Sequence, residues 1–510
     1  MFGPLAICII VLYFLALGGI AYYSHKKSVA SPDDYFIAGR TVNTFVLVLT
    51  VSATFFSMYS FIGAYGITWR IGINFINQGW WCLVFIGWTI YVVGPRLWLL
   101  GRRYKFITPA QLLAEYYGSG VVRSLVVFIC IVGIFPYAVI QFIGAGKTLV
   151  GFTDGDISYV QGLALFLVIT GAYVFFGGFR AVVLSDVLQG LFFGSVMLGT
   201  PVWLIYKMGG LENMSAFFQQ LAVTKPHLVT YKDTIWPWFL RTALILGFGF
   251  ICVPHIWQRM YSAANIKTLH KTAFLVPIWS FVLCMPILLI GILAHQLLPE
   301  ITTETSGFLF PMLFKKYAPI AGAFIIAAAF AAGMSTVDSV LLSSSSIFEE
   351  DVYREYINSN ADEKKRANVG RWFIIVFLGA ITMFSFSQGA QTLIAPIAEK
   401  GMELCSMLWP AMLGPLFWPR ATKEGAIASL VVGIVIVCGS MVPGLEKAVL
   451  PSSGIFSYSA TVAYLASFTA FFIVSYLTKP LPYSKQEDFH GYLDSVLHEA
   501  QLSSEKVFTA

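Results

Sequence analysis

Hydroxyl and carboxylate side chains crowd one segment of the chain whose other residues are mostly apolar. Residues 327–351 read AAAFAAGMSTVDSVLLSSSSIFEED, and eight such side chains fall between positions 335 and 346. Ser335, Asp338 or Ser339, and Ser343 recur at helical spacing, which predicts one polar stripe along a helix. Hard cations prefer oxygen ligands such as hydroxyls and carbonyls. The stripe is denser than helix packing requires, and it predicts a path for an ion or a solute.

A second polar segment, TVSATFFSMYSFIGAYG, covers residues 50–66. Its hydroxyl side chains are those of Ser52, Thr54, Ser57, Tyr59 and Ser60. One interpretation is close packing of helices through small residues. The other is a locally broken helix whose free carbonyls face an ion or a solute. The segment alone favours neither of these two interpretations.

Charged residues also occur within apolar segments. Asp186 follows Arg180 in GGFRAVVLSDVLQG, where it is either a helix cap with an interfacial ion pair or an inner ion site or gate. Lys400 and Glu403 are spaced to pair on one helix, while a solute contact by Glu403 is the alternative.

The segment LGFGFICVPHIWQRM, at 246–260, carries glycines and a proline that make an interrupted helix plausible. We expect His255 and Arg259 to have structural roles at its end.

The composition of the chain indicates what kind of secondary structure carries these polar residues. Hydrophobic residues make up 57% of the 510-residue chain and charged residues only 11%, against about 25% charged in soluble proteins. Since backbone groups in hydrocarbon must be paired within the segment, the fold class is an all-α integral membrane protein. At roughly 20 apolar residues a span, we expect about thirteen transmembrane helices, at 3–24, 44–66, 76–98, 122–146, 158–178, 186–206, 236–258, 274–297, 318–348, 371–388, 392–417, 424–443 and 457–478.

Basic residues concentrate in one set of alternate loops, which predicts that these loops are cytoplasmic. With an odd number of spans, the N-terminus is then outside and the C-terminus inside. We expect residues 1–480 to form one polytopic domain in the plasma (inner) membrane and 481–510 a cytoplasmic tail, in which 492–502 form either an amphipathic helix or a disordered segment. No basic patch with interleaved aromatics indicates nucleic-acid binding, and no obligatory protein partner is evident.

These residues resemble the sodium/solute symporters, which have the leucine-transporter fold. The likeness covers nearly the whole chain and rests on DDYFIAGR (33–40), SATFFSMYSFIG, GGFRAVVLSDVLQG, VPHIWQRMYSA, AAGMSTVDSVLLSSSSIFEEDVY and WPRATKEGAIAS. The resemblance implies an inverted repeat of five helices each, with core repeats at about 44–206 and 236–417. The two spans with suspected breaks would then open the two halves.

The resemblance also implies binding sites. A sodium site would use the backbone carbonyls of Ala53, Phe56 and Ala332 and the side chains of Ser335 and Thr336. A second ion site matches Asp186, Asp338 and Ser339. Relatives commonly have a hydroxyl where this chain has Asp338, so a second sodium, a proton site and a charged-substrate contact all stay open.

Within the family, the likeness is closest to sodium/pantothenate symporters, through SATFFSMYSFIG, QFIGAGKTL (141–149) and GMELCSMLWP. Proline symporters resemble the chain less, because Phe55 stands where they have an acidic residue. Tyr137 matches a position that lines the solute pocket, and further candidates are Ser57, Gln141, Phe250 and Glu403.

We therefore expect a sodium-coupled symporter of a small organic solute, pantothenate or another monocarboxylate, with Na⁺ as the coupling ion and no cofactor. A proline or amino-acid symporter, a non-transporting solute receptor and a channel are alternatives. No paired His and carboxylate cluster of the kind that hydrolytic or metal chemistry needs lies at bilayer depth, so we expect no enzyme and no catalytic residue.

Overall fold

The structure is a computed structural model, and it describes residues 4–27, 31–153, 155–232, 236–318, 321–387, 394–442 and 444–498. Within these ranges the ordered elements are helices, and the one β feature is an isolated bridge between Val42 and Ala263. The all-α prediction is confirmed.

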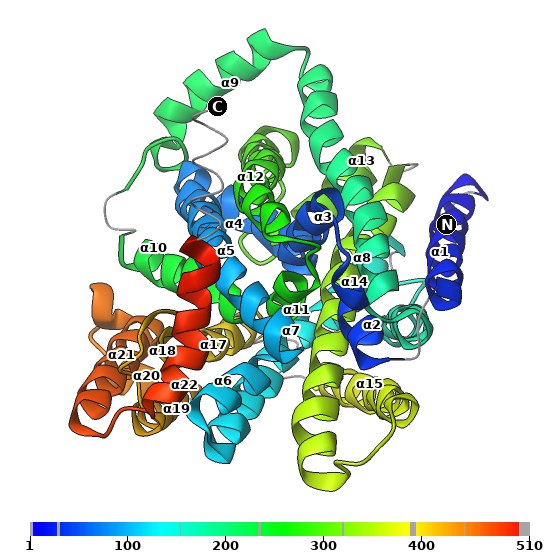
Figure 1. Cartoon of the computed structure of the whole chain (residues 1–510). Helices are drawn as coiled ribbons and strands as arrows, with labels where there is room; N and C mark the ends of the chain where they lie inside the picture. The colour runs from blue at the N-terminus through cyan, green and yellow to red at the C-terminus, as the bar shows by residue number, and fades with distance from the viewer. Residues whose placement is uncertain are drawn as a thin grey trace, which may run out of the picture.

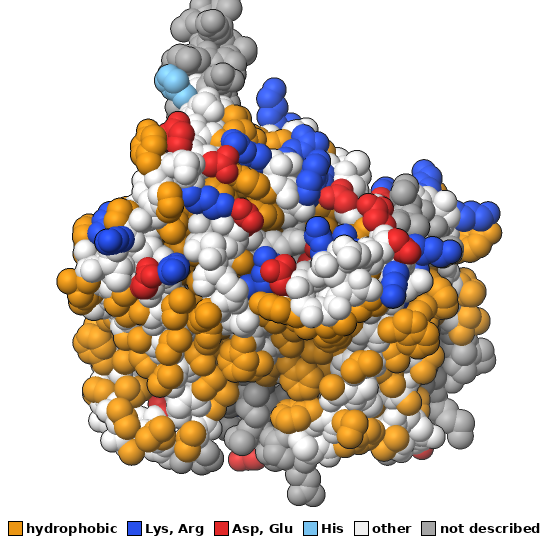
Figure 2. Space-filling model, turned by 60° about the horizontal axis from the view of Figure 1, so that its bottom comes forward, with side chains coloured by type: hydrophobic (Ala, Val, Ile, Leu, Met, Phe, Trp, Pro, Cys, Tyr) orange, Lys and Arg blue, Asp and Glu red, His pale blue; other side chains and the backbone are white. Residues whose placement is uncertain are grey.

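Long apolar helices dominate the described residues. Eight are long and apolar enough to cross a membrane, namely Cys82–Tyr104, Gly120–Thr153, Tyr159–Lys207, Ile266–Leu297, Gly322–Ile357, Glu363–Ser385, Lys423–Ser440 and Ser459–Leu477. A bent pair, Trp236–Cys252 with Pro254–Ser262, would make a ninth. Figure 2 shows a broad hydrophobic surface, with charged side chains gathered toward its upper end, as expected for a protein embedded in lipid. The total of thirteen spans stays a prediction.

One helix, α14 (Gly322–Ile347), lies at the centre of the bundle (Figure 1). It packs against α1 (Pro4–Lys27), α3 (Thr44–Phe55), α7 (Gly120–Thr153) and α8 (Tyr159–Lys207). The paired helices α19 (Lys423–Ser440) and α21 (Ser459–Leu477) lie at the opposite edge from α1. Because protein surrounds α14 on all sides, its polar stripe is buried.

The helix that carries the 50–66 segment is broken. α3 ends at Phe55, and Phe56 is extended with φ −82° and ψ 125°. The chain then continues through a π-helical turn, η2 (Tyr59–Gly63), into α4 (Ala64–Ile71). The broken-helix interpretation is thus the correct one.

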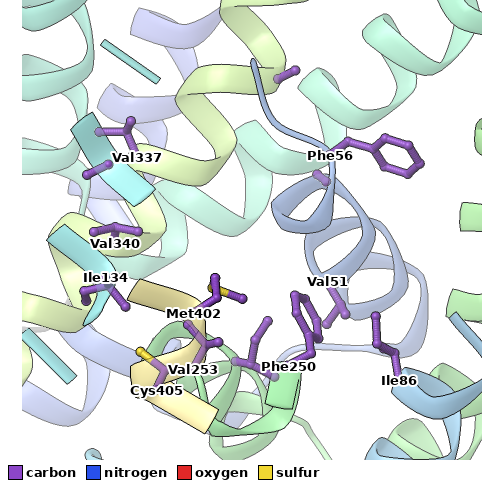
Figure 3. Packing of buried hydrophobic residues seen from close by; sticks show 14 of the residues in the cluster. Val51, Phe56, Ile86, Ile134, Phe250, Val253, Val337, Val340, Met402 and Cys405 are labelled. Carbon is purple, nitrogen blue, oxygen red and sulfur yellow. The ribbon is translucent and has the colours of Figure 1, made fainter. Parts of the chain in front are cut away.

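A second break interrupts the segment that begins at Trp236. The chain runs through α10 (Trp236–Thr242), η6 (Ala243–Phe248) and η7 (Gly249–Cys252), and α11 (Pro254–Ser262) follows at an angle of 51°. Val253 is extended, and Pro254 starts α11 because proline needs no helical partner for its nitrogen. In Figure 3, Phe250 and Val253 lie beside Met402 at this break, and Phe56 lies where the α3 ribbon ends. The two broken helices open the two predicted core repeats.

The spans predicted at 158–178 and 186–206 fall on the two halves of α8, in which two helices meet at a kink at Gly178, with φ 59° and ψ −162°. A Cβ there would meet the Tyr35 ring at 2.7 Å, so the kink requires glycine. The two predicted helices are therefore present, but the loop expected between them is wrong, since they join directly at this kink. The helix-cap interpretation of Asp186 is wrong too, since Asp186 is buried within α8 and Arg180 pairs with Asp34 at 2.6 Å.

Other helices differ from the predictions mainly at their ends. The span predicted at 392–417 divides into α17 (Ile394–Ser406) and α18 (Trp409–Phe417), and residues 392–393 lie outside the described ranges. The remaining longer helices are α5 (Ile76–Tyr104), α6 (Pro109–Tyr117), α9 (Leu211–Thr224), α12 (Ile266–Leu297), α13 (Leu309–Tyr317) and α15 (Glu363–Ser385).

The tail contains a helix that begins earlier than predicted. α22 (Tyr483–Gln486) continues through η12 (Glu487–Gly491) and on to residue 498, while 499–502 lie outside the described residues. Phe489 is buried, and Lys485 pairs with Glu115 of α6 at 2.6 Å. Asp488 accepts hydrogen bonds from Arg103 and Tyr104 at the end of α5. The first part of the tail is therefore an ordered helix docked on the bundle.

Close packing of α7 on α17 depends on glycine. A Cβ on Gly401 would lie 2.2 Å from the Gly133 carbonyl oxygen, which is backbone and cannot swing away. We expect Gly401→Val to force the helices apart and to lower the free energy of unfolding by about 1–3 kcal/mol or more. The measurement is the melting temperature in detergent. The control is Gly379→Val on α15, where nothing lies within 4 Å of the added Cβ. Equal melting temperatures for the two variants would show that the close packing of α7 on α17 does not depend on glycine at position 401.

Candidate functional site

Five oxygen atoms predicted for the sodium site come together between α3 and α14. The Ser335 hydroxyl lies 3.0 Å from the carbonyl oxygens of both Ala53 and Ala332. The Thr336 hydroxyl lies 3.5 Å from the Phe56 carbonyl oxygen and 3.3 Å from that of Ala332. All five residues are at most 1% exposed. Two segments far apart in the chain thus bring five neutral oxygens to one buried place.

The break in α3 explains why two of these carbonyls are available. In a continuous helix, Ala53 and Phe56 would accept hydrogen bonds from the Ser57 and Ser60 nitrogens. Instead, the Ser57 nitrogen donates to the Ser60 hydroxyl at 3.3 Å, and the Ser60 nitrogen donates to the Ser57 carbonyl at 2.9 Å. The two freed carbonyls therefore point to partners outside α3.

Gln141 of α7 supports the same break. Its side-chain oxygen accepts a hydrogen bond from the Met58 nitrogen at 2.8 Å, and its side-chain nitrogen donates to the Tyr137 carbonyl at 3.0 Å. A buried amide nitrogen without a partner would be costly. The Gln141 side chain provides that partner just beyond the break.

The oxygens suit a small hard cation. Each hydroxyl can turn its hydrogen away and offer lone pairs, and each carbonyl has a spare lone pair. The five oxygens carry no formal charge, so a monovalent cation can enter and leave without separating from a bound carboxylate. Among the described residues, no group of three or more His, Cys, Asp or Glu side chains could hold a metal ion.

The residues predicted for a second ion site form a neighbouring buried network. The Arg259 guanidinium donates to the Asp186 carboxylate at 2.8 Å and to the Ser339 hydroxyl at 2.7 Å. Asp338 accepts from the Ser339 nitrogen at 2.6 Å and from the Tyr173 hydroxyl. The structure thus brings the three predicted residues together and adds Arg259 as their cationic partner.

This network is linked to the five-oxygen site. The Ser339 hydroxyl donates to the Ser335 carbonyl at 2.8 Å, and the Arg259 Nε donates to Thr50 of α3 at 3.0 Å. Apart from the Tyr173 hydroxyl, its ionisable side chains are two carboxylates and one guanidinium, all fully buried. Because a buried unpaired charge is expensive, the second carboxylate favours a cation or a proton nearby. Arg259 is therefore more than the end-of-helix residue that the sequence suggested.

A cavity of about 130 Å³ lies beside the break in α3. Of the predicted pocket residues, Ser57, Tyr137 and Phe250 line it, while Gln141 supports the break and Glu403 lies behind the wall. Phe56 belongs to both the five-oxygen site and the cavity, since its carbonyl is one of the five oxygens and the residue also lines the cavity. Apolar side chains form most of the remaining wall, among them Phe55, Ile140, Ile245 and Met402.

Arg241 is a cavity residue that the sequence reading missed. It lines the cavity from α10, and its guanidinium donates to Glu399 at 2.7 Å and to Glu403 at 3.0 Å. The Lys400–Glu403 pair predicted on one helix is also present, at 3.3 Å. A lone arginine inside the apolar segment 236–258 was the available signal, because ionisable residues at bilayer depth are usually functional.

Known proteins are similar to this chain in sequence. The model of the sodium:solute symporter family matches residues 35–433. The chain is 30% identical over 438 residues to a sodium/pantothenate symporter of Escherichia coli (strain K12), covering 84% of this chain and 88% of that protein. It is 25% identical over 484 residues to the osmoregulated proline transporter OpuE of Bacillus subtilis (strain 168), covering 92% and 94%.

Solved structures agree on the fold. The chain is similar to a Na⁺-coupled sialic acid symporter in a substrate-bound, outward-open state, with a TM-score of 0.75, 20% identity, and 94% of this chain and 99% of that chain covered. It is also similar to Mhp1, a nucleobase-cation-symport-1 family transporter, with a TM-score of 0.53, 15% identity, and 90% and 99% covered. With its sequence matched over most of its length, the chain belongs to the sodium:solute symporter family, whose members are sodium-coupled transporters and not enzymes.

Proposed function

We propose that this protein carries a small organic monocarboxylate into the cell together with Na⁺, and that pantothenate is the first solute to test. The observation that carries the proposal is the set of five buried oxygens from Ala53, Phe56, Ala332, Ser335 and Thr336. Neutral oxygens from two separate helices suit a transported alkali cation.

Alternating access follows from where these oxygens lie. Sodium bound between the break in α3 and the buried helix α14 would hold the two segments in one relative position. The adjoining cavity, which shares Phe56 and Ser57 with the break, would then accept the solute. Reorientation of the bundle would release both inside. The membrane potential contributes about 2.3 kcal/mol per charge for each 100 mV.

Names of relatives support the choice of solute. Sodium/pantothenate symporters of Escherichia coli and Haemophilus influenzae are 30% and 28% identical to the chain. Proline transport is the second candidate, because the chain also matches proline transporters at 25% to 27% identity. A non-transporting receptor of the same fold is the third. We further propose about thirteen spans in the plasma membrane, with residues 1–480 as the transport domain, the N-terminus outside and the 481–510 tail in the cytoplasm.

The second ion position stays part of this proposal. Asp186, Asp338 and Ser339 form the network that Arg259 joins, and one Asp186 oxygen has no hydrogen-bond partner among the described residues. A sodium ion, a proton or a charged group of the solute would each complete the charge there.

Uptake into proteoliposomes tests the function. Labelled pantothenate and labelled proline are each supplied with an inward sodium gradient, and then with choline in place of sodium. We expect saturable, sodium-dependent pantothenate uptake that short monocarboxylates inhibit. Saturable proline uptake without pantothenate uptake would favour the second candidate. Binding without flux under any gradient would favour the receptor, and flux that does not saturate would favour a channel.

A further inference from the structure

Arg241 and Glu399 are the charged side chains that the described part of the cavity wall contains. The guanidinium of Arg241 is held from behind by Glu403, at 3.3 Å through Nε and 3.0 Å through Nη2. From the other side, Glu399 accepts from the same Nη2 atom at 2.7 Å. One arginine thus holds two carboxylates in different positions, and these two carboxylates are not equivalent.

Glu403 is a fixed partner. Its side chain is fully buried, and its second oxygen accepts from the Ser459 hydroxyl at 2.9 Å and lies 3.3 Å from the Lys400 nitrogen. Moving this carboxylate would leave several buried donors unpaired, which is costly. Glu403 therefore orients Arg241 permanently.

Glu399 is a replaceable partner. Its side chain is 44% exposed, so it can turn away and be solvated at little cost. If a carboxylate from the cavity took its place, Arg241 would keep two carboxylate partners, and the charge of Glu399 would be solvated. Arginine suits this exchange, since its planar group binds carboxylates with directed hydrogen bonds.

We infer that Arg241 is the carboxylate-binding residue of the solute cavity and that Glu399 occupies its free position until a solute carboxylate displaces it. This inference rests on the proposed function and deepens it. The mostly apolar wall around Phe55, Ile140, Ile245 and Met402 fits the rest of a monocarboxylate. Solutes that lack the carboxylate would leave Glu399 in place and bind weakly.

The test needs no knowledge of the true solute. Binding to the purified full chain in sodium is measured by thermal shift for matched pairs: pantothenate with its neutral alcohol analogue, and propionate with propionamide. We expect the acid of a pair to bind roughly 30-fold or more tightly than its neutral analogue. Equal affinities within the pairs, or no binding of any acid, would overturn the inference.

Two variants sharpen the result. Glu399→Gln removes the internal competitor, so acids should bind several-fold more tightly while the neutral analogues stay unchanged. Arg241→Gln should abolish the preference for acids, and Arg241→Lys, which keeps the charge, should retain part of it. If Glu399→Gln instead weakens binding of acids, or of proline added as a zwitterion, Glu399 is itself a solute ligand and the inference is wrong.

Sodium-driven uptake separates this inference from the proposed function. Sodium-dependent uptake with no preference for acids would overturn the inference and leave symport standing. A preference for acids without any sodium-dependent flux would support the inference about Arg241 and overturn sodium-coupled symport.

Discussion

Replacing Ser335 and Thr336 together with alanine should abolish sodium-dependent uptake at physiological sodium concentrations. The double variant removes both side-chain oxygens of the five-oxygen site and leaves the three backbone carbonyls. Hydrogen-bonding groups that contact a charge are worth about 1.5–3 kcal/mol each, so the apparent sodium affinity should fall about 100-fold or more. The measurement is the sodium concentration that gives half-maximal uptake.

A matched double variant on the same helix controls for lost packing. Ser344 and Ser345 are also adjacent and fully buried on α14, but the Ser345 hydroxyl donates to Gly370 of α15 and away from α3. Ser344→Ala with Ser345→Ala should leave the sodium dependence unchanged. If both double variants shift the sodium dependence equally, the site is not where we place it.

Replacing Arg259 with methionine should destabilise the protein severely. The substitution leaves Asp186 buried at 0% exposure without its cationic partner, and breaking a buried pair in this way costs about 3–5 kcal/mol. Thermal unfolding in detergent measures the effect. Adding Asp186→Asn removes the orphaned charge, so the double variant should be more stable than Arg259→Met alone.

An exposed pair provides the comparison for this prediction. Lys316 and Glu300 lie 3.0 Å apart, with both side chains more than 40% exposed. Lys316→Met should therefore change the free energy of unfolding by at most about 1 kcal/mol. The double variant could prove no more stable than Arg259→Met, or Arg259→Met could destabilise the protein as little as Lys316→Met does. Either result would contradict the large contribution of the buried pair to stability.

Local sequence was sufficient to predict some features of the site. Hydroxyl spacing on 335–346 predicted the buried stripe of α14. The polar and glycine-rich segments made a broken helix plausible at 246–260 and one of two open interpretations at 50–66, and the structure shows a break in both. These signals are visible because polar groups are rare in apolar spans. The five-oxygen set came only from family resemblance, since no spacing rule links Ala53 to Ser335 across 282 positions.

Contacts between distant helices were the least predictable. Arg259 lies in the last turn of α11, as expected, but the sequence did not predict that its guanidinium reaches Asp186 and Ser339. Arg241 was overlooked because only the tertiary fold brings its side chain to Glu399 and Glu403, which lie 158 and 162 positions away in the sequence. The kink at Gly178 depends on the Tyr35 ring, which lies far away in the sequence.

The central claim is that sodium in the five-oxygen site and solute in the adjoining cavity stabilise the same state. Equilibrium binding of labelled pantothenate, measured with and without sodium, tests it most directly, because coupling between two ligands must be reciprocal. We predict that saturating sodium lowers the solute Kd, that saturating solute lowers the sodium Kd by the same factor, and that Ser335→Ala with Thr336→Ala removes both effects. Solute that binds with one Kd whether or not sodium is present would contradict the account.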